Sequence, residues 1–268
     1  MIPGIRMPPL LHAPGLGLSG YTYKNTSCSQ LFQIDDRWPR LDCESKIVYL
    51  SLLTAVYCVG NDDHIMITII LIAITCLVSI LCFAGKLNVN SLIFSAYQVW
   101  HGKQWYRMFS YGLVHGGWGH LFFNMLTLFF FGRVVEQYFT LAFGDISGIV
   151  LYVVLYVSAI AVSSIWDLVK YKDDGNYRAV GASGAVSAIL FASILFEPKM
   201  GIYIYLIPIP VPGYIFAPLY LLYCWWMAKR NMDNIGHSAH FWGAVYGLLF
   251  PLVCRPDIFR HFLSQLGL

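Results

Sequence analysis

Charged side chains are scarce in this sequence. Asp, Glu, Lys and Arg make up only 12% of its 268 residues, whereas a soluble domain carries about 25%. Hydrophobic residues make up 58%, and the mean hydropathy is +0.62. This composition excludes an ordinary soluble domain and predicts an integral membrane protein with several spans. The net charge of +3 is too small to indicate a nucleic-acid partner, and none is expected.

Paired cysteine spacings are also missing. The chain has seven cysteines but no C-x-x-C, and most of them lie in apolar runs, where cysteine behaves as a small hydrophobic residue. Neither a disulfide framework nor a zinc-ribbon type of site is predicted from them.

The apolar runs predict membrane helices, each of which needs about 20 residues to cross the hydrocarbon core. Six candidate spans are found: 65–83, 119–139, 146–166, 181–196, 212–227 and 238–253. The fourth run is short, so we expect it to be screened from lipid or to begin at a water-filled cavity. The predicted fold class is an all-α, polytopic membrane protein with a bundle of six transmembrane helices.

The remaining segments are more polar. Residues 1–64 form an N-terminal extension whose structure the sequence does not indicate, and 255–268 form a short C-terminal tail. Residues 85–118 are rich in Trp and Tyr, which favour the membrane–water interface. We therefore expect 85–118 to be an interfacial first loop of a membrane domain that extends over 65–254.

Strongly polar side chains within the spans mark functional candidates, because burying them in lipid is costly. His120 and Asn124 are four residues apart on the second span and share one helical face. Two hydrogen-bond donors on one face could stabilise an oxyanion. They could equally be polar groups that hold neighbouring helices together.

Ser183 opens the fourth span within Gly181-Ala182-Ser183-Gly184. Small residues of this kind are typical of helix packing in lipid, and taken alone the stretch favours that interpretation. It is not the nucleophile elbow of soluble hydrolases, because Ala185 stands where G-x-S-x-G requires its last glycine.

His240 lies in the sixth span and precedes Gly243 and Gly247, which form a G-x-x-x-G face. The fourth span has its own small face at Gly184 and Ala188. If the two faces pack together, the histidine comes within reach of the serine and can take its proton. No Asp or Glu lies in these two spans, so the pattern predicts a dyad rather than a triad.

A metal site is the rival interpretation. His237 and His240 are three residues apart, and His115 and His120 could join them. No H-E-x-x-H motif and no carboxylate at ligand spacing accompanies these histidines. We therefore expect neither a metal nor a cofactor.

Taken together, these motifs resemble those of the rhomboid intramembrane serine proteases over about residues 65–254. The shared patterns are H-x-x-x-x-H-x-x-x-N on the second span, G-x-S-G at the fourth and A-H-x-x-G-x-x-x-G on the sixth. They are carried by His115, His120 and Asn124; by Gly181, Ser183 and Gly184; and by Ala239, His240, Gly243 and Gly247. Tyr106-Arg107 is similar to a Trp-Arg pair in the family's first loop, and Gly132 with Glu136 to its Gly-x-x-x-Glu.

The resemblance implies that Ser183 is the nucleophile and His240 its general base. It implies that His120, Asn124 and the backbone N–H of Ser183 hold the oxyanion. The implied substrates are single-span membrane proteins in a lipid bilayer, and the implied location is a bacterial inner membrane. The alternative is a catalytically inactive rhomboid-like protein that binds membrane clients. Such relatives lose the serine or the histidine, and this chain keeps both.

One departure from the family pattern concerns the base. The family often has an aromatic residue four positions after the serine, stacked on the histidine, and this chain has Ser187 there. An aromatic residue from a neighbouring span would then have to orient His240. The fifth span is rich in bulky aromatics, including Trp225 and Trp226, which we expect to plug a lateral gate.

Overall fold

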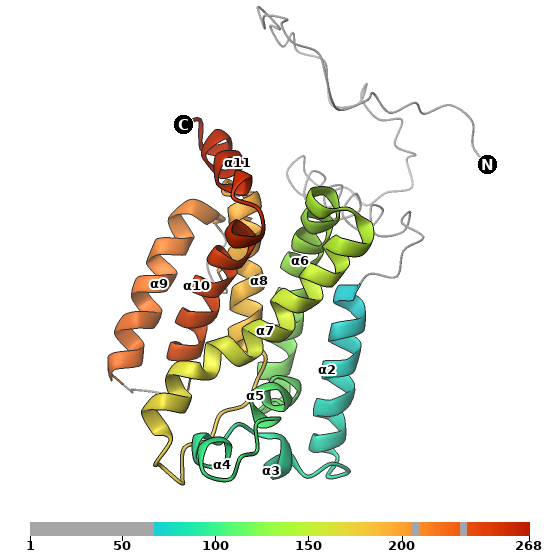
Figure 1. The fold of residues 1–268 in the computed structure, drawn as a ribbon, viewed down its shortest axis with the longest axis vertical. Coiled ribbons are helices and arrows are strands. Elements are labelled where there is room, and N and C mark those ends of the chain that lie inside the picture. Colours follow the sequence, from blue (N-terminus) through green and yellow to red (C-terminus); the bar gives the residue numbers. More distant parts are fainter. Residues whose placement is uncertain (1–66, 205–208, 231–234) are drawn as a thin grey trace, which may run out of the picture. The chain divides into compact units, whose positions relative to one another are not determined.

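Helices dominate the computed structural model of the chain, which describes residues 67–204, 209–230 and 235–268 (Figure 1). The predicted N-terminal extension, 1–64, lies outside the described residues, as do the first two residues of the predicted first span. The expected helical character is confirmed. A two-stranded ribbon, β1 (Gly201–Ile202) with β2 (Val211–Pro212), is the exception within the described part.

A helix occupies each of the six predicted apolar runs. They are α2 (Ile67–Phe83), α6 (Trp118–Phe143), α7 (Asp145–Tyr171), α8 (Ser183–Phe196), α9 (Gly213–Arg230) and α10 (His237–Cys254). Of the described helices, α6 and α7 are long and apolar enough to cross a membrane, and α2 and α8 are shorter apolar helices. The number of spans therefore stays a prediction.

Helix α8 is the central helix of the bundle. Every residue from Gly184 to Phe196 is buried, and α6, α7 and α10 all pack against it. Its 14 residues extend over only about 21 Å, less than the ~30 Å of a bilayer core. The short fourth run is thus enclosed by other helices, as its length predicted.

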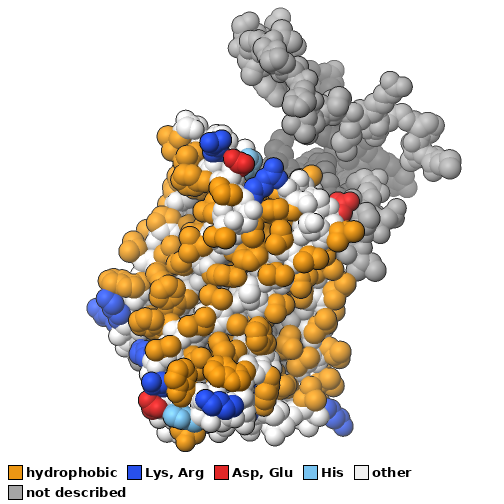
Figure 2. Space-filling model, in the orientation of Figure 1, with side chains coloured by type: hydrophobic (Ala, Val, Ile, Leu, Met, Phe, Trp, Pro, Cys, Tyr) orange, Lys and Arg blue, Asp and Glu red, His pale blue; other side chains and the backbone are white. Residues whose placement is uncertain are grey.

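Apolar side chains cover the outer face of these helices, and charged side chains gather toward its two ends (Figure 2). Large exposed hydrophobic residues occur on α2, α6, α7 and α9, among them Leu77, Phe130, Val150 and Leu222. A surface of this kind fits a lipid environment.

The loop between α2 and α6 is folded. It contains α3 (Val89–Leu92), α4 (Ala96–Trp100), α5 (Arg107–Ser110) and the 3-10 turn η1 (Tyr111–Leu113). Buried Arg107 fixes this loop, because its guanidinium donates to the carbonyl oxygens of Asn90 at 2.9 Å and Ile93 at 2.7 Å.

The predicted C-terminal tail contains a further helix, α11 (Asp257–Leu266). Its Ile258 is buried in the main core, and the ring of His261 lies 3.0 Å from the carbonyl oxygen of Phe196 at the end of α8. The tail is therefore part of the packed domain.

Glu136 holds the start of α2 against α6. Its carboxylate accepts the backbone N–H groups of Ile67 at 2.6 Å and Thr68 at 3.0 Å, and the Thr68 hydroxyl at 2.6 Å. A Cβ at Gly132, one turn earlier, would collide with Thr68 and with the hydroxyl of Tyr152. The Gly-x-x-x-Glu motif thus joins α2, α6 and α7.

Replacing Glu136 by Gln should lower the thermal stability of the protein. An amide has one acceptor oxygen, so at least one buried donor of α2 loses its partner, at a cost of about 1–3 kcal/mol. Thermal unfolding in detergent checks this, with Gln137→Ala, exposed on the same helix, as the control. An unchanged melting temperature for Glu136→Gln would contradict the capping role.

Candidate functional site

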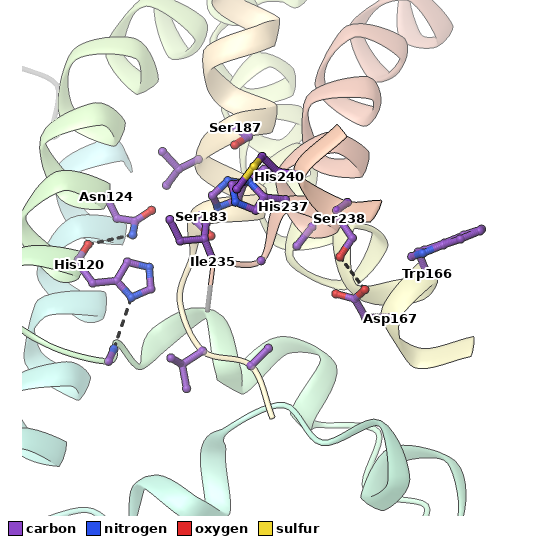
Figure 3. Close-up of a pocket in the computed structure, with 18 of the residues that line it drawn as sticks. His120, Asn124, Trp166, Asp167, Ser183, Ser187, Ile235, His237, Ser238 and His240 are labelled. Carbon is purple, nitrogen blue, oxygen red and sulfur yellow. Dashed lines mark hydrogen bonds between the residues drawn. The ribbon is translucent and has the colours of Figure 1, made fainter. Parts of the chain in front are cut away.

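A cavity of about 1150 Å³ lies among α6, α7, α8, α9 and α10. Ser183, His240, His120 and Asn124, the four residues predicted from separate motifs, all line it. Figure 3 shows His120 and Asn124 on α6 facing the start of α8, with His240 beside Ser183. The structure therefore brings together one hydroxyl, two imidazoles and an amide from three helices.

Close packing of α8 on α10 sets the place of His240. A Cβ on Gly243 would collide with the carbonyl oxygen of Gly184, and one on Gly247 with that of Ala188. Only glycine allows backbones to approach this closely. This contact holds the first turn of α10, which carries His240, against the N-terminal turn of α8.

The loop that enters α8 explains Gly181. This residue has φ +110°, a region that L side chains rarely adopt. A Cβ there would also collide with the ring of His120. Its N–H donates to the carbonyl oxygen of Tyr111 at 3.0 Å. Gly181 thus lets the loop turn beside His120 and places half-buried Ser183 at the first position of α8.

His120 and Asn124 each keep an N–H group for the cavity. The N–H of Gly116 donates to Nδ1 of His120 at 3.5 Å, which leaves the ring proton on Nε2. The side-chain amide of Asn124 donates to the carbonyl oxygen of His120 at 2.9 Å. Because an amide nitrogen carries two hydrogens, the second can still serve a ligand.

His115 does not line the cavity but supports the loop in front of Ser183. The hydroxyl of Ser79 donates to the carbonyl oxygen of Leu113 at 2.8 Å, so it accepts from Nδ1 of His115 at 3.0 Å. The other ring nitrogen then accepts the N–H of Ala182 at 3.5 Å. Burial, and secondarily the nearby His120, lowers the pKa of His115 to about 3, which keeps the ring neutral.

Arg107 and Glu136 also lie away from the cavity lining. Arg107 fixes the first loop, and Glu136 lies sixteen residues, or ~24 Å along α6, from His120. Like His115, these two residues therefore support the fold around the cavity and do not line it.

Tyr220, one of the aromatic residues of the predicted fifth span, lines the cavity. Its hydroxyl lies 2.9 Å from that of Ser187, the residue that replaces the family's usual aromatic. An aromatic ring from α9 therefore lies next to Ser187, the position at which the family often has an aromatic residue on α8.

The expectation that Trp225 and Trp226 face a neighbouring helix and so plug a gap is wrong, whereas the gate role of the fifth span stays a prediction. Their exposed fractions are 50% and 44%, and their rings lie under Lys229 and Arg230. The inner face of α9 instead carries residues at helical spacing from Tyr220, of which Met227 is buried and lines the cavity.

His237 lies next to the proposed base. Its ring centroid is 6.0 Å from that of His240 and 5.5 Å from that of Tyr223, edge-on to both. One residue later, the hydroxyl of Ser238 donates to the carboxylate of Asp167 on α7 at 2.6 Å. These contacts hold the first turn of α10 on two sides.

The four histidines of the rival metal set divide into two pairs. His115 and His120 lie together with ring centroids 5.0 Å apart, and His237 lies with His240. In the described part of the chain, the group with metal-ligand spacing is instead Cys224 with His237 and His240.

Comparisons with known proteins agree with the motifs. The family model of the Rhomboid domain matches residues 102–257. The chain is 28% identical over 149 residues to "RHOMBOID-like protein 12, mitochondrial" of Arabidopsis thaliana, covering 53% of this chain and 44% of that protein. It is 25% identical over 205 residues to "Rhomboid protease AarA" of Providencia stuartii, covering 69% of this chain and 70% of that one. The chain thus spans less than half of the plant relative.

Proposed function

We propose that this chain, which belongs to the rhomboid family, is an intramembrane serine endopeptidase that uses a Ser183–His240 dyad. Rhomboid proteins are integral membrane proteins and generally intramembrane proteases, and one relative is named as a protease. The observation that carries the proposal is that Ser183, His240, His120 and Asn124 line the same cavity.

The proposed reaction begins when His240 takes the proton of Ser183 and the Oγ attacks a peptide carbonyl. The negative charge that develops on the carbonyl oxygen receives N–H groups from His120 and Asn124. The N-terminus of α8 adds its backbone N–H of Ser183 and its positive dipole end. His240 then gives the proton to the leaving amine, and water hydrolyses the acyl-enzyme with the same base.

The cavity wall suggests how a substrate enters. Phe123 and Thr127 of α6 line one side, and Tyr220 and Met227 of α9 line another. A single-span substrate in extended form could reach Ser183 between α6 and α9 from the lipid. This route requires α2, α6, α7, α8, α9 and α10 to be the six spans of a multi-pass protein, which is part of the proposal.

The proposed location is a membrane, and the relatives come from different compartments. One relative is bacterial and the other is named as mitochondrial in a plant. The expected bacterial inner membrane is therefore one of two compartments compatible with the relatives.

Labelling with a fluorophosphonate tests the function directly. The purified full chain should form a covalent adduct on Ser183, read by mass spectrometry, because only an activated serine reacts readily. His240→Ala should lose the adduct, whereas Ser193→Ala, whose hydroxyl bonds within α8 to the carbonyl oxygen of Leu190, should keep it. A folded wild-type protein without an adduct would favour the inactive, client-binding alternative, and an adduct on another serine would refute the assignment of Ser183.

A further inference from the structure

A cluster of three side chains with metal-binding atoms includes the proposed base, His240. Cys224 of α9 and His237 and His240 of α10 each present one donor atom, and these three atoms lie within 4.8 Å of one another. Cys224 and His237 are buried, and His240 is half-buried at the cavity. The first turn of α10 supplies both histidines, and buried Cys224 faces them from the neighbouring helix.

One sulfur and two imidazole nitrogens form a ligand set that suits Zn²⁺. Zinc–ligand distances of ~2.0–2.3 Å place tetrahedral donor atoms about 3.3–3.7 Å apart. Donor atoms as far apart as 4.8 Å need to approach by about 1.1–1.5 Å, a movement on the scale of a side-chain rotation. Because His237 and His240 line the cavity, a water molecule there can complete the coordination.

We propose that Zn²⁺ binds to Cys224, His237 and His240 and thereby inhibits the protease reversibly. The Cys224 thiol releases its proton to water and binds as thiolate, and each neutral histidine binds through a ring lone pair. The lone pair that His240 gives to zinc can no longer take the proton of Ser183. The inhibitory part rests on the proposed function, whereas the binding site does not.

A hydrolytic zinc enzyme is a different outcome of the same ligand set. Such an enzyme needs a general base for its metal-bound water, usually a carboxylate. Among the described residues, Asp167 is the carboxylate that lines the cavity, and it already accepts the hydroxyl of Ser238. The surroundings therefore favour inhibition over activation.

Metal binding is measured first in the Ser183→Ala protein, so that activity plays no part. Co²⁺ should bind at one per chain with a thiolate-to-cobalt charge-transfer absorption, and Zn²⁺ should displace it. Adding Cys224→Ala should abolish this absorption. It should also weaken Zn²⁺ binding by more than ~100-fold, because loss of even outer-shell partners costs ~10–100-fold.

Matched variants decide the outcome. Cys76→Ala, which removes a half-buried cysteine of α2, should bind both metals as the parent protein does. His237→Gln is a second test of the site if Cys224→Ala fails to fold. An unchanged absorption or zinc affinity in the folded Cys224 or His237 variant would overturn the site, as would the absence of any charge-transfer band in the parent.

Inhibition is then measured on the full chain with native Ser183 and a transmembrane substrate. Zn²⁺ should lower the cleavage rate, and a chelator should restore it. In Cys224→Ala the zinc concentration for half inhibition should rise by the factor found for binding, with each rate compared to that variant's own zinc-free rate. Cys76→Ala should follow the parent.

Three results would overturn the inhibitory role. Zinc that binds without slowing cleavage refutes it and leaves the protease proposal intact. Zinc that accelerates cleavage, with loss of activity on chelation, refutes both inhibition and the serine mechanism. If the protein binds Co²⁺ with the expected absorption but does not cleave the substrate when no metal is present, the protease function is refuted and the metal site is retained.

Discussion

Ser183→Ala is expected to lower cleavage of a transmembrane substrate by ~10⁴-fold or more, on the precedent of nucleophile removal in serine proteases. The change removes one oxygen from a half-buried residue at the cavity surface, so the fold should be retained. Without this hydroxyl no acyl-enzyme can form, and the oxyanion donors alone provide little rate. The measurement is the rate of product formation in liposomes, with thermal unfolding as the check on folding.

Ser193→Ala controls for the loss of a hydroxyl from α8, and His240→Ala and the double variant test whether the two residues act as one unit. Ser193→Ala removes a hydroxyl that donates to the carbonyl oxygen of Leu190 in α8 and to the sulfur of Met200, away from the cavity lining, and it should cleave at close to the wild-type rate. His240→Ala should be as inactive as Ser183→Ala, and the double variant should lose no further activity, because residues that act as a unit are not additive. Cleavage by Ser183→Ala near the wild-type rate would refute the dyad.

The helix positions were largely predictable from the sequence because polar and Gly/Pro-containing segments separate the apolar runs. The predicted run 181–196 became α8 with only its first two residues outside the helix. The contact between the glycine faces of α8 and α10 was also predictable, since Gly243, Gly247 and Gly184 leave no side chain between backbones.

The orientation of α9 was not predictable. Aromatic residues occur on all of its faces, so no apolar period distinguishes the side of Tyr220 from that of Trp225 and Trp226. The neighbourhood of Cys224 and His237 depends on that orientation. Contacts between separate helices decide both, and a single sequence does not encode them in any local pattern.

The helix in the C-terminal tail was not predicted, for a related reason. Residues 257–266 carry charges and too few apolar residues to read as a span, yet they form α11. Ile258 is buried because α11 lies at the end of α8, where His261 reaches the carbonyl oxygen of Phe196. That end of α8 exists only in the folded bundle.

Asn124→Ala and His120→Ala should each lower the catalytic rate constant by ~10²-fold, the usual loss for one oxyanion donor. The cause is that each removes an N–H group that the substrate needs only when charge develops on its carbonyl oxygen. Substrate affinity should therefore change little. Kinetics over a range of substrate concentrations in the bilayer separate the two quantities.

Asn124 has a competing structural role, because its amide already donates to the carbonyl oxygen of His120. The kinetics therefore distinguish an oxyanion donor from a residue that only stabilises the helix. A purely structural amide would show its loss in stability or in apparent affinity. Thr127→Ala is the control, since Thr127 lines the same cavity one turn later and its hydroxyl bonds to the carbonyl oxygen of Phe123. If Asn124→Ala changes only the melting temperature or the apparent affinity, as a helix-packing residue would, then the oxyanion assignment fails and Asn124 belongs to the helix contacts that hold α6 in place.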